Sequence, residues 1–240
     1  MAELWVVRAG TVPYEDARRA QKALEQARID GRIADLLILI EHPPAYTKGR
    51  RTTPDELPMG EDWYRMQGIE VLDTDRGGRV TYHGPGQLVA YPIISLRELA
   101  EPDDVHDFIR KMEWAMIGAL GDWGVQSHVI DGLTGVWTVG EPPPAGEARK
   151  IGSIGIHVSR GVTTHGLAIN VNNDLQPFEW IVPCGIEACR MTSLGRELGA
   201  EQDLDAFGTT VATRLAGVYQ RKLVERAWED VAGPLALEPA

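Results

Sequence analysis

We predict an α+β fold for this chain of 240 residues, and three features of the sequence support that class. Short runs of apolar and β-branched residues recur along the chain, as expected of strands with one or both faces buried. Three longer segments repeat apolar residues at helical spacing. These helices are interleaved irregularly with the strands, which favours one α+β domain, with a small C-terminal lobe as the alternative.

The first half of the chain is predicted to hold one helix and several short strands. Residues 4–7 form the first strand, and apolar residues at helical spacing predict a helix from Pro13 to about Ile29. A buried strand at 34–41 ends before a pair of prolines, because proline cannot donate to a ladder. Residues 47–68 are rich in charge, proline and glycine and predict a loop. Further strands are expected at 69–74, 79–83 and 88–95.

The second half is predicted to hold two long helices. One spans 103–123, where apolar residues form a single stripe, and the other spans roughly 203–224. Strands are expected between them at 125–130, 135–139, 150–158 and 162–171, with a mobile hairpin connection at 141–149. We therefore predict a single domain over residues 1–240, with a core at about 4–220 and a tail at 225–240.

The composition argues against several functional classes. The formal net charge of −11, from 24 basic and 35 acidic residues, disfavours a general nucleic-acid binder. The most apolar run, residues 36–40, is too short to cross a bilayer, and the N-terminus lacks the pattern of a secretory signal. Two cysteines do not make a disulfide framework. We expect a cytoplasmic protein with reduced thiols that binds neither nucleic acid nor membrane.

Basic residues nevertheless gather in two places, at 47–51 and 76–79, whereas residues 98–107 and 225–238 are acid-rich. One interpretation is scattered solvated charge. The other is a cationic rim that attracts an acidic partner in spite of the overall repulsion.

Residues 76–87, which read RGGRVTYHGPGQ, contain four glycines within a short segment. Glycine costs backbone entropy, so this density predicts either a tight hairpin or a backbone that another group must approach closely. Backbone N–H groups in such a segment, together with that of Gly185, could stabilise negative charge on an acyl oxygen.

Cys184 stands between Pro183 and Gly185 and is predicted to lie on a turn, where its sulfur can be reached. The alternative is a buried structural cysteine, which is the interpretation we favour for Cys189. The spacing of the two cysteines does not fit a zinc site, and we expect no metal. A nucleophilic cysteine needs thiolate character, although a free thiol titrates near ~8.5.

Lys150 could supply that character, because an ammonium beside a sulfur favours the charged form of the thiol. The same lysine, once neutral, could accept a proton from an incoming amine. His83 and His165 compete for this role. Each histidine also fits a structural position, and Lys150 also fits an ordinary exposed lysine.

Several motifs in order resemble the octanoyl-[acyl-carrier-protein]:protein N-octanoyltransferases. They are the 76–87 segment, Lys-x-x-Ser-Ile-Gly from Lys150, His-Gly-Leu-Ala-Ile-Asn from His165, and Pro-Cys-Gly around Cys184, while 41–50 is similar to the family's upstream loop. The resemblance covers roughly residues 4–220. It implies the fold of biotin and lipoate protein ligases, an α+β domain with a mixed β-sheet and flanking helices. The 141–149 loop and the acidic tail lie outside these motifs.

The resemblance also implies site residues. The family's Cys/Lys dyad corresponds to Cys184 and Lys150, and no cofactor is implied. Its acyl-binding backbone maps onto three stretches, which are Arg76, Gly77, Gly78, Arg79, Val80, Thr81, Tyr82 and His83; Ser153, Ile154 and Gly155; and Gly166, Leu167 and Ala168. Val80, Ile154 and Leu167 are expected to form an apolar groove for the acyl chain.

The activity implied is a ping-pong acyl transfer, the first step of endogenous protein lipoylation. Octanoyl-acyl carrier protein is the donor, and the acceptors are lipoyl domains of 2-oxoacid dehydrogenase complexes and the glycine cleavage H protein. Lys48, Arg50, Arg51, Arg76 and Arg79 are the expected docking rim for these acidic partners. Two alternatives stay open: an ATP-dependent lipoate or biotin ligase, and a catalytically silent module that binds acyl carriers.

Overall fold

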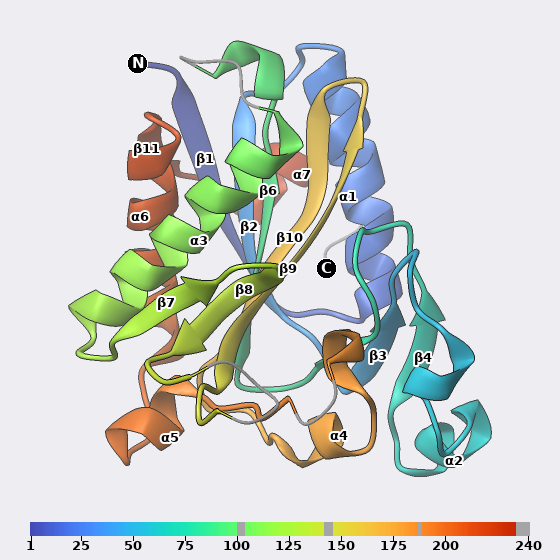
Figure 1. Cartoon of the computed structure of the whole chain (residues 1–240). Coiled ribbons are helices and arrows are strands. Elements are labelled where there is room, and N and C mark those ends of the chain that lie inside the picture. The colour runs from blue at the N-terminus through green and yellow to red at the C-terminus, as the bar shows by residue number, and fades with distance from the viewer. Residues whose placement is uncertain (100–103, 142–145, 187–188, 234–240) are drawn as a thin grey trace.

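The computed structural model describes residues 1–99, 104–141, 146–186 and 189–233, and a large mixed β-sheet lies at its centre (Figure 1). Eight strands follow the order β11-β1-β2-β6-β10-β9-β8-β7. β1 pairs in parallel with β2 and β11, and the other neighbours in this sheet are antiparallel. The strands are β1 (Glu3–Thr11), β2 (Asp35–Glu41), β6 (Gln87–Ile93), β7 (Ser127–Ile130), β8 (Leu133–Thr138), β9 (Lys150–Ser159), β10 (Val162–Asn170) and β11 (Lys222–Glu225).

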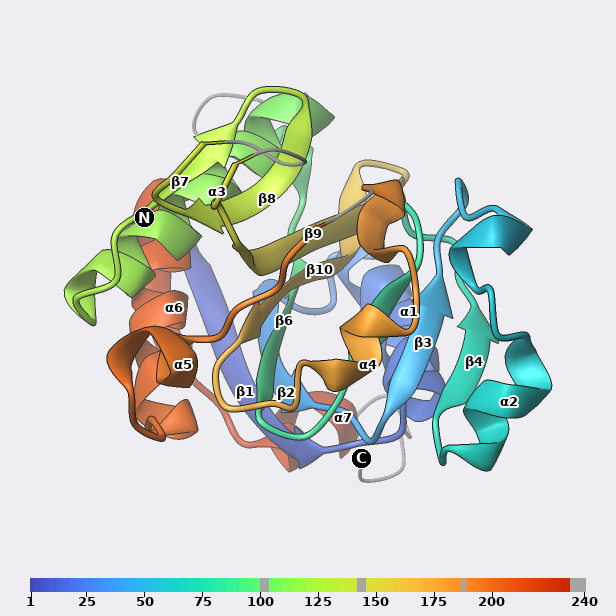
Figure 2. The same cartoon turned by 60° about the horizontal axis from the view of Figure 1, so that its bottom comes forward.

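A smaller sheet of three strands stands beside the large one. Its order is β4-β3-β5, with β3 (Ala45–Lys48) parallel to β4 (Glu70–Asp73) and antiparallel to β5 (Thr81–His83). Figure 2 shows β3, β4 and the helix α2 grouped to one side of the large sheet. This unit has its own apolar cluster, which includes Tyr46, Val80 and Tyr82. The small sheet is therefore a packed element that can hold one wall of a site.

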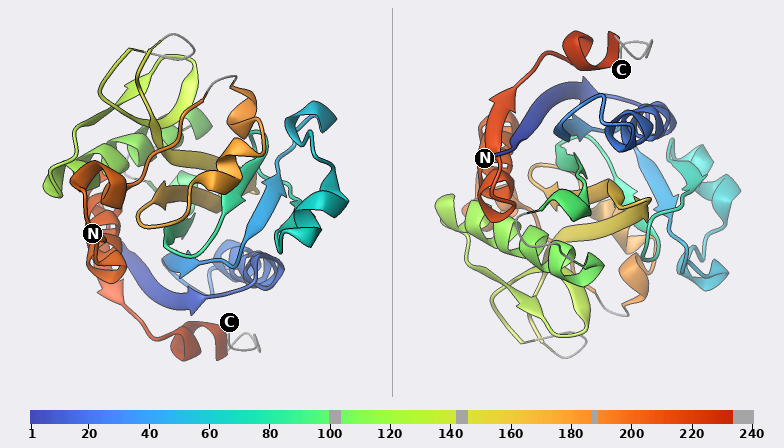
Figure 3. Two further views of the ribbon diagram at one scale, coloured as in Figure 1. Left: turned by 90° about the horizontal axis from the view of Figure 1, so that it is seen from below. Right: turned by 90° about the horizontal axis from the view of Figure 1, so that it is seen from above.

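Helices cover both faces of the large sheet (Figure 3). Leu37 and Leu39 of β2 pack in one cluster with α3 and α6, whereas Leu36, Ile38 and Ile40 pack in another with α1. Alternate side chains of one strand thus face opposite layers, which explains its continuous apolar run. The helices are α1 (Tyr14–Ile29), α2 (Glu61–Met66), α3 (Val105–Asp122), α4 (Gln176–Glu179), α5 (Leu194–Leu198), α6 (Leu204–Val218) and α7 (Trp228–Ala232), with 3₁₀ turns η1 (Pro54–Glu56), η2 (Leu96–Glu98) and η3 (Pro183–Gly185).

The predicted helix at 203–224 is wrong at its C-terminal end. α6 stops at Val218, Gln220 takes a left-handed conformation with φ of 53°, and Lys222–Glu225 forms β11 beside β1. The apolar residues Leu223 and Val224 belong to this strand and not to the helix. In the predicted tail, Trp228–Ala232 forms α7, whose Val231 packs in the core, and residues 234–240 lie outside the described residues.

The predicted loop at 47–68 also contains structure, namely η1 and the short helix α2. α2 has acidic residues in its first turn and Arg65 in its last, a distribution that suits the helix dipole. Residues 142–145 of the predicted mobile connection lie outside the described residues. Among the helices that the structure describes, none combines the length and apolar character needed to cross a bilayer.

A buried carboxylate links α1 and β2 to the segment that leads into β11. Asp35, at the start of β2, accepts hydrogen bonds of 2.8 Å from Arg28 on α1 and from Arg221 before β11. All three side chains are less than a tenth exposed. Asp35 also accepts the Ser95 backbone N–H at 3.0 Å. Two buried guanidinium groups therefore share one buried carboxylate.

We expect Asp35→Ala to lower the free energy of unfolding by about 3–5 kcal/mol, because it leaves both arginines without their buried partner. Glu98→Gln is the matched control, since Glu98 pairs with the same Arg28 but its side chain is 61% exposed. The control is expected to change stability by less than about 1 kcal/mol. Urea unfolding of the three proteins measures both values. Equal stability of Asp35→Ala and wild type would contradict the buried-cluster interpretation.

Candidate active site

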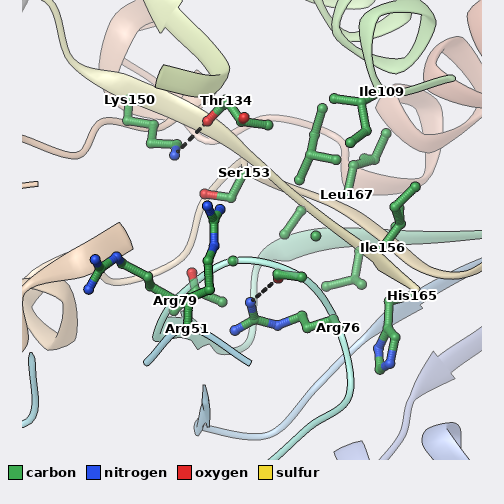
Figure 4. Close-up of a pocket in the computed structure, with 18 of the residues that line it drawn as sticks. Arg51, Arg76, Arg79, Ile109, Thr134, Lys150, Ser153, Ile156, His165 and Leu167 are labelled. Atoms are coloured by element: carbon green, nitrogen blue, oxygen red, sulfur yellow. Dashed lines mark hydrogen bonds between the residues drawn. The ribbon is translucent and has the colours of Figure 1, made fainter. Parts of the chain in front are cut away.

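A cavity of about 450 Å³ lies where β9 and β10 of the large sheet meet the small sheet (Figure 4). Its lining residues differ in exposure. Arg51, Gly132, Thr134 and Gly185 are exposed, and we call them the mouth. Tyr14, His83, Tyr91 and His165 are buried, and we call them the inner end. The cavity thus runs from solvent into the protein.

The glycines of the 76–87 segment let the chain lie directly against β9. Gly77 donates its N–H to the Ile156 carbonyl at 2.9 Å. A side chain at Gly155 would meet the Gly77 oxygen at 3.0 Å and Arg76 Cδ at 3.1 Å. Arg76, Gly77, Gly78 and Arg79 all line the cavity. Close backbone approach, one of the two interpretations of this segment, is therefore what the structure shows.

The next predicted residues, 80–83, lie partly at the cavity and partly in the core. Thr81 and His83 line the cavity, whereas Val80 and Tyr82 pack in the apolar cluster of the small sheet. Alternate side chains of a strand point to opposite faces, so a continuous stretch cannot place every side chain in the cavity. Val80 is fully buried away from the predicted groove.

β9 and β10 supply the remaining predicted residues as a paired set. Ser153, Ile154 and Gly155 lie opposite Ala168, Leu167 and Gly166 in the antiparallel register, and all six line the cavity. Ile156 and Ile109 add apolar wall, and Ile109 comes from the α3 stripe that the sequence assigns to the core. Thus both Ile154 and Leu167 of the expected groove face the cavity.

Lys150 is the first residue of β9 and lines the same cavity, although its side chain is buried. Its Nζ donates to the Thr134 carbonyl oxygen at 2.9 Å and lies 5.3 Å from the centre of the Trp137 ring. Both contacts are favourable for an ammonium. The interpretation of Lys150 as an ordinary exposed lysine is wrong.

Cys184 lies in η3, and the next two residues, Gly185 and Ile186, line the cavity with Lys150. Gly185 has φ of 65°, and a side chain there would meet Arg79 Nε at 2.7 Å. Arg79 is held by an ion pair with the buried carboxylate of Glu56. The structure therefore brings the turn that carries Cys184 and the amine of Lys150 to one cavity. The Cys184 side chain lies outside the described part of the structure.

The chain after this turn is tied to Lys150 through the backbone. Lys150 donates its N–H to the Arg190 oxygen at 2.8 Å and accepts the Thr192 N–H at 2.9 Å. Cys189 does not line the cavity, and its sulfur lies 3.9 Å from Met191 Sδ at the cluster of the small sheet. A packing role for Cys189 remains the prediction.

The polar rings at the inner end of the cavity have hydrogen-bond partners within the protein. His165 Nε2 donates to Asp75 at 2.8 Å, so its Nδ1 accepts from the Tyr14 hydroxyl at 3.2 Å. His83 lies 2.8 Å from Gln87 Oε1 through Nδ1 and 3.3 Å from Thr47 Oγ1 through Nε2. Since all four ring nitrogens of His83 and His165 have partners, an alkyl chain placed beside them would leave none of them without a hydrogen bond.

Burial keeps these histidines neutral. It lowers the pKa of His83 well below its usual range. It also lowers the pKa of His165, although Asp75 opposes that shift. The hydrogen bond from His165, in turn, holds the pKa of Asp75 far below its usual value. Neither histidine is therefore well suited to accept a proton near pH 7.

Several lining residues were not predicted from the sequence. Tyr14 was assigned to a helix stripe, and Tyr91 to an apolar strand, because single-sequence patterns cannot separate a core side chain from one at a cavity. Thr134, which lines the cavity, and Trp137, which contacts Lys150, also lie outside every motif. Within the described residues, no three His, Cys, Asp or Glu side chains gather in a way that could hold a metal ion.

Comparison with known proteins assigns the family. The model of the lipoyl protein ligase A/B catalytic domain matches residues 13–216. An octanoyltransferase from Mycobacterium tuberculosis is 47% identical over 203 residues, which cover 85% of this chain and 81% of that protein. The chain belongs to the octanoyltransferase family. Members of the octanoyltransferase family are acyltransferases, so the resemblance found in the sequence motifs is confirmed.

Two further likenesses extend this result. An octanoyltransferase from Koribacter versatilis is 39% identical to this chain over 219 residues, which cover 91% of this chain and 85% of that protein. A bipartite lipoate protein ligase from Thermoplasma acidophilum superposes with a TM-score of 0.73 at 16% identity, covering 98% of this chain and 91% of that chain. At that identity the likeness concerns the fold alone, and it confirms the predicted α+β ligase-like class.

We expect His42→Gln to flatten the acid dependence of stability. His42 donates to the Val12 oxygen and accepts from Tyr91, both at 2.7 Å, and burial lowers its pKa from 6.5 to about 4. Between these values the unfolded chain binds a proton that the native chain does not, so the free energy of unfolding falls as the pH falls. The loss for this one group is about 3 kcal/mol.

Urea unfolding of wild type and His42→Gln between pH 7 and pH 4.5 tests this. Glutamine keeps a donor and an acceptor but does not titrate. The difference in stability between the two proteins should therefore shrink as the pH falls. A constant difference over this range would contradict a neutral, buried His42.

Proposed function

We propose that this chain transfers an octanoyl group from octanoyl-acyl carrier protein to a specific lysine of an apo lipoyl domain, through a thioester on Cys184. The observation that carries the proposal is the single cavity lined by Lys150 and by the two residues that follow Cys184. Membership of the octanoyltransferase family supports the reaction class. The match to the lipoyl protein ligase A/B catalytic domain supports an acceptor of the lipoyl-domain type.

In the first step, the Cys184 thiolate attacks the carbonyl carbon of the donor thioester. The new carbon–sulfur bond forms as the bond from the carbonyl carbon to the carrier sulfur breaks, and the leaving sulfur takes a proton from the Lys150 ammonium, which becomes neutral. The Lys150 ammonium favours the thiolate before attack. Backbone N–H groups at Gly185 and in the glycine segment are the candidates that stabilise the oxyanion. Exchange between thioesters is nearly neutral in free energy, so this step requires no nucleotide.

The acyl chain would occupy the cavity between mouth and inner end. Ile154, Ile156, Leu167 and Ile109 supply apolar contacts along it. Burial of an eight-carbon chain contributes about 0.8 kcal/mol per methylene, or about 5 kcal/mol in all. At the inner end, every ring nitrogen of His83 and His165 has a hydrogen-bond partner, so none would face the acyl chain without one.

In the second step, the acceptor lysine attacks the acyl-enzyme, and Cys184 leaves as the thiolate. The attacking amine must lose a proton, and neutral Lys150 is the candidate acceptor. An amide replaces a thioester in this step, which makes it favourable. The proposed acceptors are lipoyl domains of 2-oxoacid dehydrogenase complexes and the glycine cleavage H protein.

The docking rim is narrower than the basic clusters of the sequence suggest. Arg50 and Arg51 are exposed, and Arg51 and Arg79 line the cavity. Lys48 pairs with Glu61 at 2.6 Å and with Asp73 at 3.2 Å. Arg76 is buried and donates to the Thr47 oxygen at 2.5 Å. Arg79 is held by its ion pair with Glu56. We therefore assign the rim to Arg50 and Arg51, in one cytoplasmic catalytic domain.

We expect an octanoyl adduct on Cys184 when the protein is mixed with octanoyl-acyl carrier protein. Intact-protein mass spectrometry followed by peptide mapping locates it. Cys184→Ser should show no thioester adduct and no turnover, and Cys189→Ser is the matched control that should keep both. Loss of the adduct in the Cys189 variant, with retention in the Cys184 variant, would overturn the assignment.

We also expect transfer to an apo lipoyl domain to proceed in the absence of ATP and Mg²⁺. Strict dependence of the transfer on ATP would instead identify a ligase.

Lys150→Ala should slow acylation of Cys184 by about 10²-fold or more at neutral pH, because a positioned proton-transfer group contributes at least that much. Stopped-flow or quench measurements give the acylation rate. An unchanged rate in Lys150→Ala would remove that residue from the mechanism.

A further inference from the structure

Glu113 is a buried carboxylate on α3 that the proposed reaction does not use. Its side chain is 6% exposed, and Oε1 accepts a hydrogen bond of 2.9 Å from the Gly135 N–H on β8. Oε2 lies 3.5 Å from Arg110 NH1, on a side chain that is 47% exposed. Burying a carboxylate costs several kcal/mol, and a half-exposed cation offsets only part of that. The 2.9 Å hydrogen bond from the Gly135 N–H is therefore the shortest described contact of this carboxylate.

The acceptor of the Lys150 ammonium belongs to the same peptide group. Lys150 Nζ donates to the Thr134 carbonyl oxygen at 2.9 Å, as Figure 4 shows, and that carbonyl is joined directly to the Gly135 nitrogen. A peptide group is planar and rigid. Glu113 and Lys150 thus bind opposite ends of one rigid unit.

We propose that Glu113 is a positioning residue for Lys150 and acts through the peptide between Thr134 and Gly135. A carboxylate that accepts the N–H fixes the plane of the peptide. It also polarises the group, so that the carbonyl becomes a stronger acceptor for the ammonium. This role rests on the proposed function, because it concerns the lysine of the acyl transfer.

The packing around Gly135 supports direct mechanical contact with Lys150. Gly135 has φ of 116°, and a side chain there would meet Lys150 Cε at 2.8 Å and Nζ at 3.3 Å. The register of β8 on β9 shifts between Val136 and Trp137, next to this peptide. The peptide is therefore not held by a regular ladder at this point. Glu113 supplies the hydrogen bond that orients it.

A purely structural role for Glu113 predicts different behaviour. If the residue only joins α3 to β8, its removal lowers stability and leaves the acylation rate of the folded fraction unchanged. If it positions Lys150, its removal lowers that rate only while Lys150 is present. A double-mutant cycle separates the two.

The experiment measures single-turnover acylation of Cys184 by octanoyl-acyl carrier protein. We expect Glu113→Ala to slow the step about tenfold at saturating donor, with the donor concentration at half-maximal rate changed by less than about twofold. Glu113→Gln should recover most of this rate, because its amide oxygen can still accept the Gly135 N–H. Arg110→Gln is the matched control, since it removes the ion pair and keeps the bond to Gly135, and it should stay within about twofold of wild type.

The cycle repeats Glu113→Ala in a Lys150→Met background, where we expect a further effect below about twofold. Alkylation of Cys184 by iodoacetamide at pH 7, read by peptide mass, gives a second rate in variants too slow to acylate. Thermal unfolding shows whether each variant is folded. If Glu113→Ala is not folded, the acylation and alkylation rates of Glu113→Gln test the inference in its place.

An equal slowing by Glu113→Ala in both backgrounds would overturn the inference, and so would a wild-type rate in folded Glu113→Ala. Both outcomes leave the proposed function intact. Absence of any adduct on wild-type Cys184 would instead remove the proposed function and the inference with it.

Discussion

The backbone pairing between Lys150 and residues 190–192 is the constraint on which the rest of the site depends. It consists of a bond from the Lys150 N–H to Arg190 and one from the Thr192 N–H to Lys150. Cys184 lies only six residues before Arg190, so this short bridge limits how far its turn can move from the start of β9. Two such bonds contribute about 1 kcal/mol each, which is too little to hold a loop alone.

A chain of buried side chains reinforces the bridge. His83 bonds to Gln87, and the amide of Gln87 donates to Asn170 at 2.9 Å. Asn170 then donates to the Thr192 oxygen at 3.0 Å. This path joins β5, β6 and β10 to the same segment that pairs with Lys150. Buried polar chains of this kind rigidify a structure. His83 thus has a clear structural task, which agrees with its engaged ring nitrogens and lowered pKa.

Much of the fold could be predicted from the sequence, and the exceptions have physical reasons. Periodicity located α1, α3 and the long strands because each buries a face of the large sheet. It failed at Lys222–Glu225, where a four-residue strand follows a helix without a proline, and where pairing with β1 decides the conformation. The Glu113 carboxylate was hidden for a similar reason, because its partner at Gly135 lies on another element.

For the site, the motifs were informative where backbone geometry constrains the residue type. Gly155 has no room for a side chain, and Gly185 has a left-handed conformation, so both carry a signal in the sequence. Tyr14, Thr134 and Trp137 carry none, since many side chains fit a helix stripe or a strand. A continuous motif does not show which of its side chains face the cavity and which face the core. Val80 and Tyr82 belong to the motif but face the core, because alternate side chains of an extended segment point to opposite sides.

The direction of the cavity has a consequence for the order of the proposed reaction. The acyl chain would point toward the buried inner end, which leaves the thioester near the exposed mouth beside Lys150. Donor and acceptor must then approach the same atom past Arg51 and Gly185, so they exclude each other. The proposed carrier and acceptor domains are expected to be acidic, and the net charge of −11 on this chain would oppose both at a distance. At physiological salt, screening reduces this repulsion beyond ~8 Å, so the exposed Arg50 and Arg51 would govern the final approach. The shape of the cavity therefore supports the proposed ping-pong order.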